Sequence, residues 1–232
     1  MSTPNITVYF LGASRAIRIP WLLEELNVPY TLVSSPRSKA GVAPQEFKDK
    51  IPAPLKKSPT LTDGDDVTVQ ESGAIVQYLL DMYDKDHKLL PSAVAERCKV
   101  YEWVHAAEGT FMLHALAILY ARWKIPEGAK EYLPEMEKNM SANVQNDLKW
   151  IESALKEQKE RGNEFLVGKT LTAADIMMGF SIEFIFTRKL GTQGGNWPET
   201  EAWLARMLER SAYKKAVEKS GYTLDSKGEF RT

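Results

Sequence analysis

Apolar residues follow two different rhythms along this chain. In the first third, short stretches rich in β-branched and aromatic residues alternate with segments of helical period. Strands are predicted at 6–11, 30–34, 60–62 and 67–70, and helices at 14–28, 45–50 and 72–83. This order implies a parallel first pair of strands with a right-handed crossover, and the Asp63-Gly64 pair supplies a hairpin turn.

Beyond the first third the period is helical throughout. Helices are predicted at 94–123, 131–161, 172–186 and 199–219, and no convincing strand accompanies them. We therefore expect an α+β protein of two domains. Residues 1–84 would form a βαβ-ββα domain that resembles thioredoxin, 85–93 a linker, and 94–232 an all-helical domain. The Cys-x-x-Cys of thioredoxin is missing, so any sulfur chemistry must come from a ligand.

The charge balance and the single cysteine exclude several classes of function. Lys and Arg number 30 against 31 Asp and Glu, which lacks the basic excess of a nucleic-acid-binding protein. No apolar run approaches the roughly 20 residues that cross a bilayer, and the first residues lack the features of a signal peptide. With only Cys98, which we expect to be buried, there is no disulfide framework, so a cytoplasmic location is predicted. No histidine has a companion at metal-ligand spacing, so no metal is expected.

Two short segments carry the strongest chemical signal. Before the third strand stands an X-Pro bond, which can be cis at modest cost and, ahead of an edge strand, would turn the main chain outward to pair with a peptide. The last helix of the first domain opens with a Glu-Ser pair, where free N–H groups and the positive dipole end suit a carboxylate. An ordinary helix cap would also explain that pair, but not the first segment. The residues are Lys57, Ser58, Pro59, Glu71 and Ser72.

These segments resemble the glutathione site of the cytosolic glutathione transferases, and the likeness extends over the whole chain. The Ser-Arg pair that opens the first helix, followed by Trp-Leu-Leu-Glu-Glu-Leu, is similar to a fungal and bacterial branch of that family. The resemblance implies that the main chain of Ser58 pairs with the cysteinyl part of glutathione. It assigns the γ-glutamyl amine and carboxylate to Glu71 and Ser72, and places Lys57 near the glycyl carboxylate.

The start of the first helix is the candidate for activating the thiol. A thiol is nucleophilic as the thiolate, which a helix N-terminus, a hydroxyl donor or a cation stabilises. Ser14 stands at this point, and its hydroxyl or its N–H could contact the sulfur. The alternative is that Ser14 only caps the helix and that the activating position falls on Ala13 or slightly earlier, with Arg15 or Arg18 assisting the thiolate.

The resemblance also implies the overall activity. Glutathione would attack a hydrophobic electrophile or reduce an organic hydroperoxide, in a homodimeric enzyme of detoxification. The electrophile pocket would include Phe111, Met112 and Ala115, and the capping box from Thr172 to Asp175 would be structural. Two alternatives stay open: another glutathione-dependent reaction such as a lyase or isomerase, and a non-catalytic ligand-binding or regulatory protein of the same fold.

Overall fold

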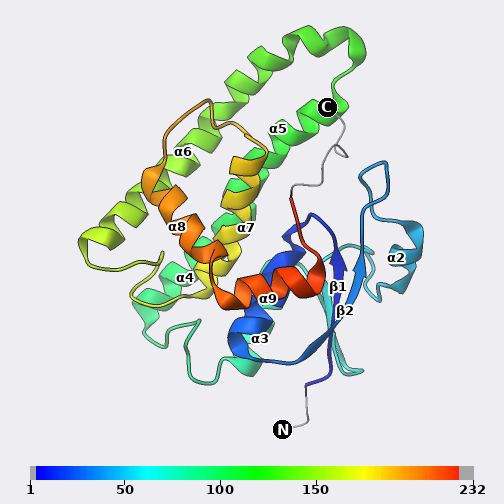
Figure 1. Cartoon of the computed structure of the whole chain (residues 1–232), viewed down its shortest axis with the longest axis vertical. Helices are drawn as coiled ribbons and strands as arrows, with labels where there is room; N and C mark the ends of the chain where they lie inside the picture. The colour runs from blue at the N-terminus through cyan, green and yellow to red at the C-terminus, as the bar shows by residue number, and fades with distance from the viewer. Residues whose placement is uncertain (1–3, 225–232) are drawn as a thin grey trace. The chain divides into compact units, whose positions relative to one another are not determined.

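Four strands form one sheet in the first part of the chain. The structure is a computed structural model, described over residues 4–224 (Figure 1). The strands are β1 (Ile6–Leu11), β2 (Tyr30–Ser35), β3 (Thr60–Asp63) and β4 (Val67–Gln70). Their order is β2-β1-β3-β4, with β1 parallel to β2 and antiparallel to β3. The parallel pair and the hairpin confirm the predicted topology. The prediction that an edge strand follows Pro59 is wrong, because β1 and β4 both pair with β3.

Helices cover both faces of this sheet. The 3₁₀ helix η1 (Arg15–Ile17) leads into α1 (Arg18–Leu26), which packs against α3 (Ser72–Tyr83), and α3 contacts β3 and β4. The short α2 (Gln45–Lys50) packs its Phe47 against Leu11 of β1. Because successive residues of a strand point to opposite faces, Ile6, Val8 and Phe10 face α1 and α3. This is the thioredoxin-like arrangement that the sequence predicts.

The last described helix, α9 (Ser211–Ser220), belongs to the same unit as the sheet. Residues 4–90 and 208–224 form one compact unit, and residues 91–207 form the other. The ring of Tyr213 packs edge-on against Trp21 with centroids 5.0 Å apart, and the guanidinium of Arg210 binds the Glu25 carboxylate at 2.6 and 2.9 Å. These contacts hold α9 on α1, in the unit that contains the sheet. The sequence instead predicts one helical domain over all of 94–232. Residues 225–232 of that range lie outside the described part of the chain.

The second unit is helical, and within residues 91–207, all of which are described, no strand forms. A π-helical segment, η2, interrupts the first long helix that the sequence predicts, and a 3₁₀ segment, η3, precedes the second. The helices are α4 (Val94–Ala106), η2 (Ala107–Met112), α5 (Leu113–Lys124), η3 (Glu127–Tyr132), α6 (Leu133–Glu160), α7 (Ala173–Thr187) and α8 (Pro198–Leu208). Twelve of the fifteen residues of α7 are buried, so this helix is the centre of the unit.

A capping box opens α7. The Thr172 side chain accepts from the N3 backbone, and the N-cap N–H donates to the Asp175 carboxylate at 2.9 Å. That carboxylate is fully buried and also accepts from Leu166 N–H, from the Thr172 hydroxyl and from Trp203 Nε1. Burial raises the pKa of the Asp175 carboxyl, and the four donors act in the opposite direction. The side chain thus ties the start of α7 to α8 and to the preceding loop.

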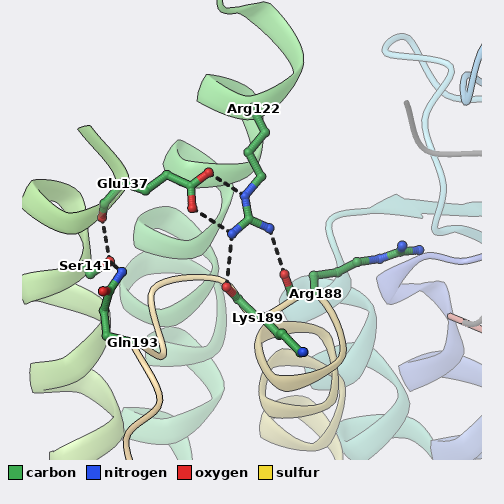
Figure 2. Close-up of polar contacts among 6 residues, drawn as sticks. All are labelled: Arg122, Glu137, Ser141, Arg188, Lys189 and Gln193. Atoms are coloured by element: carbon green, nitrogen blue, oxygen red, sulfur yellow. Dashed lines mark hydrogen bonds and ion pairs between the residues drawn. The ribbon is translucent and has the colours of Figure 1, made fainter. Parts of the chain in front are cut away.

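One arginine fastens the far end of α7 to its neighbours (Figure 2). Arg122, near the end of α5, binds both carboxylate oxygens of Glu137 on α6 at 2.7 and 2.8 Å. The same guanidinium donates to the carbonyls of Arg188 at 2.8 Å and Lys189 at 3.1 Å, just beyond α7. Planar, bidentate pairing of this kind fixes orientation as well as distance. Three helices are therefore held together at this end of the helical unit.

Three further findings concern the single cysteine, membrane-spanning helices and metal-binding side chains. Cys98 is exposed on α4, so the prediction of a buried thiol is wrong; the residue lies on the outer side of a helix whose buried positions are Val100, Trp103, Val104 and Ala106. Over the described residues, each helix is too short or too polar to span a membrane. Within the same part of the chain, His, Cys, Asp and Glu side chains form no cluster suited to a metal ion.

Candidate ligand site at the end of the sheet

The predicted binding segments meet at one end of the sheet. Tyr9 of β1 lies beside Thr60 of β3, which lies beside Gln70 of β4. Just past this row, the turn after β1 leads to Ser14, β3 is preceded by the Ser58–Pro59 bond, and β4 leads into Glu71 and Ser72. Segments up to 58 residues apart in the sequence (14 and 72) are therefore neighbours because of the strand register.

Ser58 is held by its side chain rather than by its backbone. The Ser58–Pro59 bond is cis, as expected. The Ser58 hydroxyl donates to the Tyr9 carbonyl and accepts from the Leu11 N–H, both at 2.9 Å, where the antiparallel ladder would otherwise continue. Among the described residues, the main-chain N–H and C=O of Ser58 have no hydrogen-bond partner. They are therefore available to an extended ligand, and the serine side chain fixes where they lie.

The N-terminus of α3 offers both signs of charge to a ligand. Glu71 adopts an unusual backbone conformation for a non-glycine residue, with φ 74° and ψ 118°, and its exposed side chain makes no cap bond. The first N–H groups of the helix consequently lack a side-chain acceptor, and they carry the positive end of the helix dipole. A carboxylate fits at these N–H groups, and an ammonium fits at the Glu71 carboxylate.

A buried arginine stands behind this helix start. Arg18 of α1 is 0% exposed, and its Nη1 donates to the Ser72 hydroxyl at 3.1 Å. Ser72 is itself 3% exposed. Because the hydroxyl oxygen accepts from Arg18, the single hydroxyl proton of Ser72 remains to be donated elsewhere. The guanidinium of Arg18 thus reaches the α3 end of the site.

The Ser14 hydroxyl acts as a helix cap. It donates to the Leu11 carbonyl at 2.7 Å and accepts from the Ala16 N–H at 3.2 Å, which caps η1. One hydroxyl has one proton, so this proton is already committed. Within the described chain, the main-chain N–H of Ser14 has no backbone partner. Ala13, just before it, has a positive φ of 50°, and Arg15 begins η1.

Two predicted site residues remain to be placed. The Lys57 side chain is exposed, and the main-chain carbonyl of Lys57 accepts from the Thr60 hydroxyl at 2.7 Å. Pro59 supplies the ring of the cis bond before β3. Both therefore lie at the same end of the sheet as Ser58.

A cavity that the sequence did not reveal adjoins the β1–η1 turn. Its volume is about 310 Å³. Arg37 donates to the carbonyls of Gly12 and Gly41 at 3.0 Å, which joins the loop after β2 to the turn after β1. The only sequence signal is a polar loop with several serines, which looks like any solvated loop. The lining residues are Gly12, Ala13, Ser34, Ser35, Pro36, Arg37, Ser38, Gly41, Ser220, Gly221 and Thr223.

The residues expected to face an electrophile lie in the interior of the helical unit. Phe111 and Ala115 are 0% exposed and Met112 is 1% exposed. The Phe111 ring lies 6.3 Å from Trp103 and 6.0 Å from Trp150, centroid to centroid. These side chains are buried in the core of the helical unit, and their contact with an electrophile stays a prediction. A helical aromatic stripe fits either role, which is why the sequence could not decide.

Comparison with known proteins gives a consistent result over both units. The family described as "Glutathione S-transferase, N-terminal domain" matches residues 4–81, and "Glutathione S-transferase, C-terminal domain" matches residues 111–211. The chain is 30% identical to glutathione S-transferase 1 of Saccharomyces cerevisiae over 95% of this chain and 97% of that protein.

Solved structures agree with the sequence match. A crystal structure of a glutathione S-transferase from Actinobacillus pleuropneumoniae superposes with a TM-score of 0.76 at 29% identity, covering 95% of this chain and 94% of that one. A glutathione transferase homologue from Lodderomyces elongisporus, solved with two GSH per subunit, gives a TM-score of 0.68 at 25% identity, covering 92% and 98%.

Proposed function

Because the chain belongs to the glutathione S-transferase family, we propose that it binds glutathione at the carboxyl end of β1 and holds its sulfur as a thiolate. The observation that carries this proposal is the convergence of the Ser58 main chain, the start of α3 and the start of η1. A tripeptide with an amine, two carboxylates and a thiol uses all three. The glutathione in the Lodderomyces elongisporus structure supports the choice of ligand.

Each part of glutathione has a matching group. The cysteinyl main chain pairs with the N–H and C=O of Ser58, in the manner of a short added strand. The γ-glutamyl carboxylate binds the first N–H groups of α3 and the Ser72 hydroxyl, and its ammonium binds the Glu71 carboxylate. The exposed ammonium of Lys57 pairs with the glycyl carboxylate.

Arg18 acts on this site through Ser72. By donating to the Ser72 oxygen, the guanidinium fixes the hydroxyl so that its proton points to the ligand carboxylate. A hydroxyl polarised by a cation is also a stronger donor. Arg18 is therefore a positioning residue for the γ-glutamyl end, rather than a group that contacts the sulfur.

The thiolate is stabilised by the start of η1. Since the Ser14 hydroxyl proton is given to Leu11, the sulfur accepts from the Ser14 main-chain N–H. The helix dipole and the cation of Arg15 at the first position of η1 lower the thiol pKa further. Lowering that pKa raises the fraction of thiolate at neutral pH, which is the nucleophile.

The second substrate occupies the cavity beside Gly12 and Ala13. There the thiolate displaces a leaving group from an electrophile and forms a carbon–sulfur bond. With an organic hydroperoxide the thiolate attacks the terminal oxygen of the O–O bond, which releases the alcohol and leaves the sulfenic acid of glutathione. A second glutathione thiol then attacks that sulfur, which forms the disulfide and releases water. Proximity and a lowered pKa supply the rate. This proposal includes a cytoplasmic homodimer with a role in detoxification, as the family resemblance implies.

A second candidate function is glutathione binding without turnover. The observation that favours it is that the Ser14 hydroxyl already donates its proton to the Leu11 carbonyl. Titration calorimetry with glutathione, followed by turnover assays with 1-chloro-2,4-dinitrobenzene and cumene hydroperoxide, separates the two. Binding with turnover supports the enzyme. Binding without turnover of either substrate supports the ligand-binding protein. Absence of glutathione binding would overturn both.

A further inference from the structure

A groove with an indole floor lies between α4 and α6 of the helical unit. Trp150 of α6 stacks on Trp103 of α4 with ring centroids 4.3 Å apart and planes inclined by 20°. Trp103 is 4% exposed, whereas Trp150 keeps 36% of its surface accessible. The cavity above them has a volume of about 300 Å³, at the lower end of small-molecule pockets. It is lined by Lys99, Glu102, Trp103, Trp150, Ser153, Ala154, Glu157, Gln158, Arg161, Leu166 and Val167.

The spacing of the lining residues explains why a groove forms. Those of α6 lie at 150, 153, 154, 157 and 158, which is one face of a helix, and Arg161 caps its C-terminal end. Those of α4 repeat the same spacing at 99, 102 and 103. Leu166 and Val167, from the segment that follows α6, close one end with apolar surface. None of these residues belongs to the unit that contains the proposed glutathione site.

The charges on the rim cancel within each helix. Lys99 pairs with Glu102 at 2.6 Å on α4, and Arg161, which caps α6, pairs with Glu157 of that helix at 3.8 Å. Two cations and two carboxylates so arranged offer no net charge to a ligand. The groove therefore selects by shape and by its aromatic floor rather than by ionic attraction.

One polar group on the wall is free to donate. The Gln158 side-chain oxygen accepts from the Asn163 side-chain nitrogen at 2.7 Å, which fixes the orientation of the amide. Among the described residues, the amide NH₂ of Gln158 has no hydrogen-bond partner. A ligand that supplies an acceptor would satisfy this donor.

We propose that this groove binds an uncharged planar aromatic molecule that carries a carbonyl group. The ring system packs on the exposed part of the Trp150 indole, in the offset geometry that aromatic pairs prefer. The carbonyl oxygen accepts from Gln158. The site is independent of glutathione, so the protein takes two different small molecules on its two units.

The test uses 6-propionyl-2-dimethylaminonaphthalene, an uncharged naphthyl ketone whose emission shifts to the blue in apolar surroundings. The full-length protein should bind it saturably, at one site per chain, with the same dissociation constant in the presence of saturating glutathione. Trp150→Leu should weaken binding about tenfold or more, because it removes the stacking surface and keeps an apolar side chain. Ala154→Leu should weaken it similarly, because it fills the groove and leaves both indoles in place.

A matched control and a clear contrary result complete the design. Tyr120→Leu removes another exposed aromatic of the same unit, outside the groove, and should leave the dissociation constant unchanged. Far-ultraviolet circular dichroism checks that each variant is folded. Unchanged binding by Trp150→Leu or by Ala154→Leu, competition by glutathione, or no saturable binding by the wild type would each overturn the proposal. Each leaves the glutathione proposal standing.

Discussion

Replacing Arg18 by methionine isolates the role assigned to this buried guanidinium. Methionine keeps a long unbranched side chain and removes the bond to the Ser72 hydroxyl. A hydrogen bond to a charged group contributes about 1.5–3 kcal/mol. If that energy serves to orient the Ser72 hydroxyl, Arg18→Met should weaken glutathione binding by about 10- to 150-fold, since 1.4 kcal/mol is a factor of ten.

The assay compares two ligands by titration calorimetry. One is glutathione, and the other is its analogue with 4-aminobutyrate in place of the γ-glutamyl residue, which lacks the carboxylate in question. Arg18→Met should reduce the affinity for glutathione and leave that for the analogue within about twofold. Ser72→Ala should cause a loss of the same size, and the double variant should lose little more, because both act on one interaction. Arg18→Lys, which keeps the charge, should recover part of the affinity.

Two results would refute the role of Arg18. Equal losses for glutathione and for the analogue would mean that Arg18 supports the site as a whole, and not the carboxylate end. Additive losses in the double variant would mean that Arg18 and Ser72 act separately. Thermal unfolding of each variant establishes that binding is measured on folded protein.

Three further predictions follow from single contacts. Ser14→Ala should lower the free energy of unfolding by about 1 kcal/mol through loss of the helix cap, and turnover should stay within about twofold of wild type. A loss of turnover of about 100-fold would show instead that the hydroxyl contacts the sulfur. Asp175→Asn should lower the free energy of unfolding by about 2–5 kcal/mol in urea titration. Its NH₂ would face two buried donors, either Leu166 N–H and Trp203 Nε1–H or the N–H and hydroxyl of Thr172, and a change below about 1 kcal/mol would contradict this. Burial, together with Asp63, raises the pKa of the Tyr78 hydroxyl from 10.0 to about 12. The neutral hydroxyl therefore stabilises the fold fully below pH 10.0, and this stabilisation is lost as the pH rises to about 12. Asp63→Asn should shift the alkaline rise of tyrosinate absorbance to lower pH, and an unchanged titration would count against the contact.

Much of the first unit follows from local sequence. The strand 67–70 and the helices 45–50 and 72–83 form where they are predicted, because alternation, the Asp63-Gly64 turn and the Glu-Ser helix start all act over a few residues. Pro20 illustrates the limit of such rules. It stands inside the predicted helix 14–28, yet α1 begins only at Arg18, so the proline lies in the first turn, where its missing N–H costs little.

Long-range pairing accounts for what the sequence could not give. The position of β3 inside the sheet depends on β1, about 50 residues earlier in the sequence. The return of α9 to α1 depends on contacts such as Trp21 with Tyr213. The bond between Arg18 and Ser72 joins residues 54 apart, so the sequence could suggest both residues without linking them.

The most direct test of the central claim is an ultraviolet difference titration of the protein with glutathione, in which thiolate absorbance is followed against pH. If the start of η1 stabilises the sulfur as proposed, the thiolate signal appears at a pH clearly below the range in which free glutathione ionises. Saturable binding whose thiolate appears only in the range of the free thiol would contradict the account.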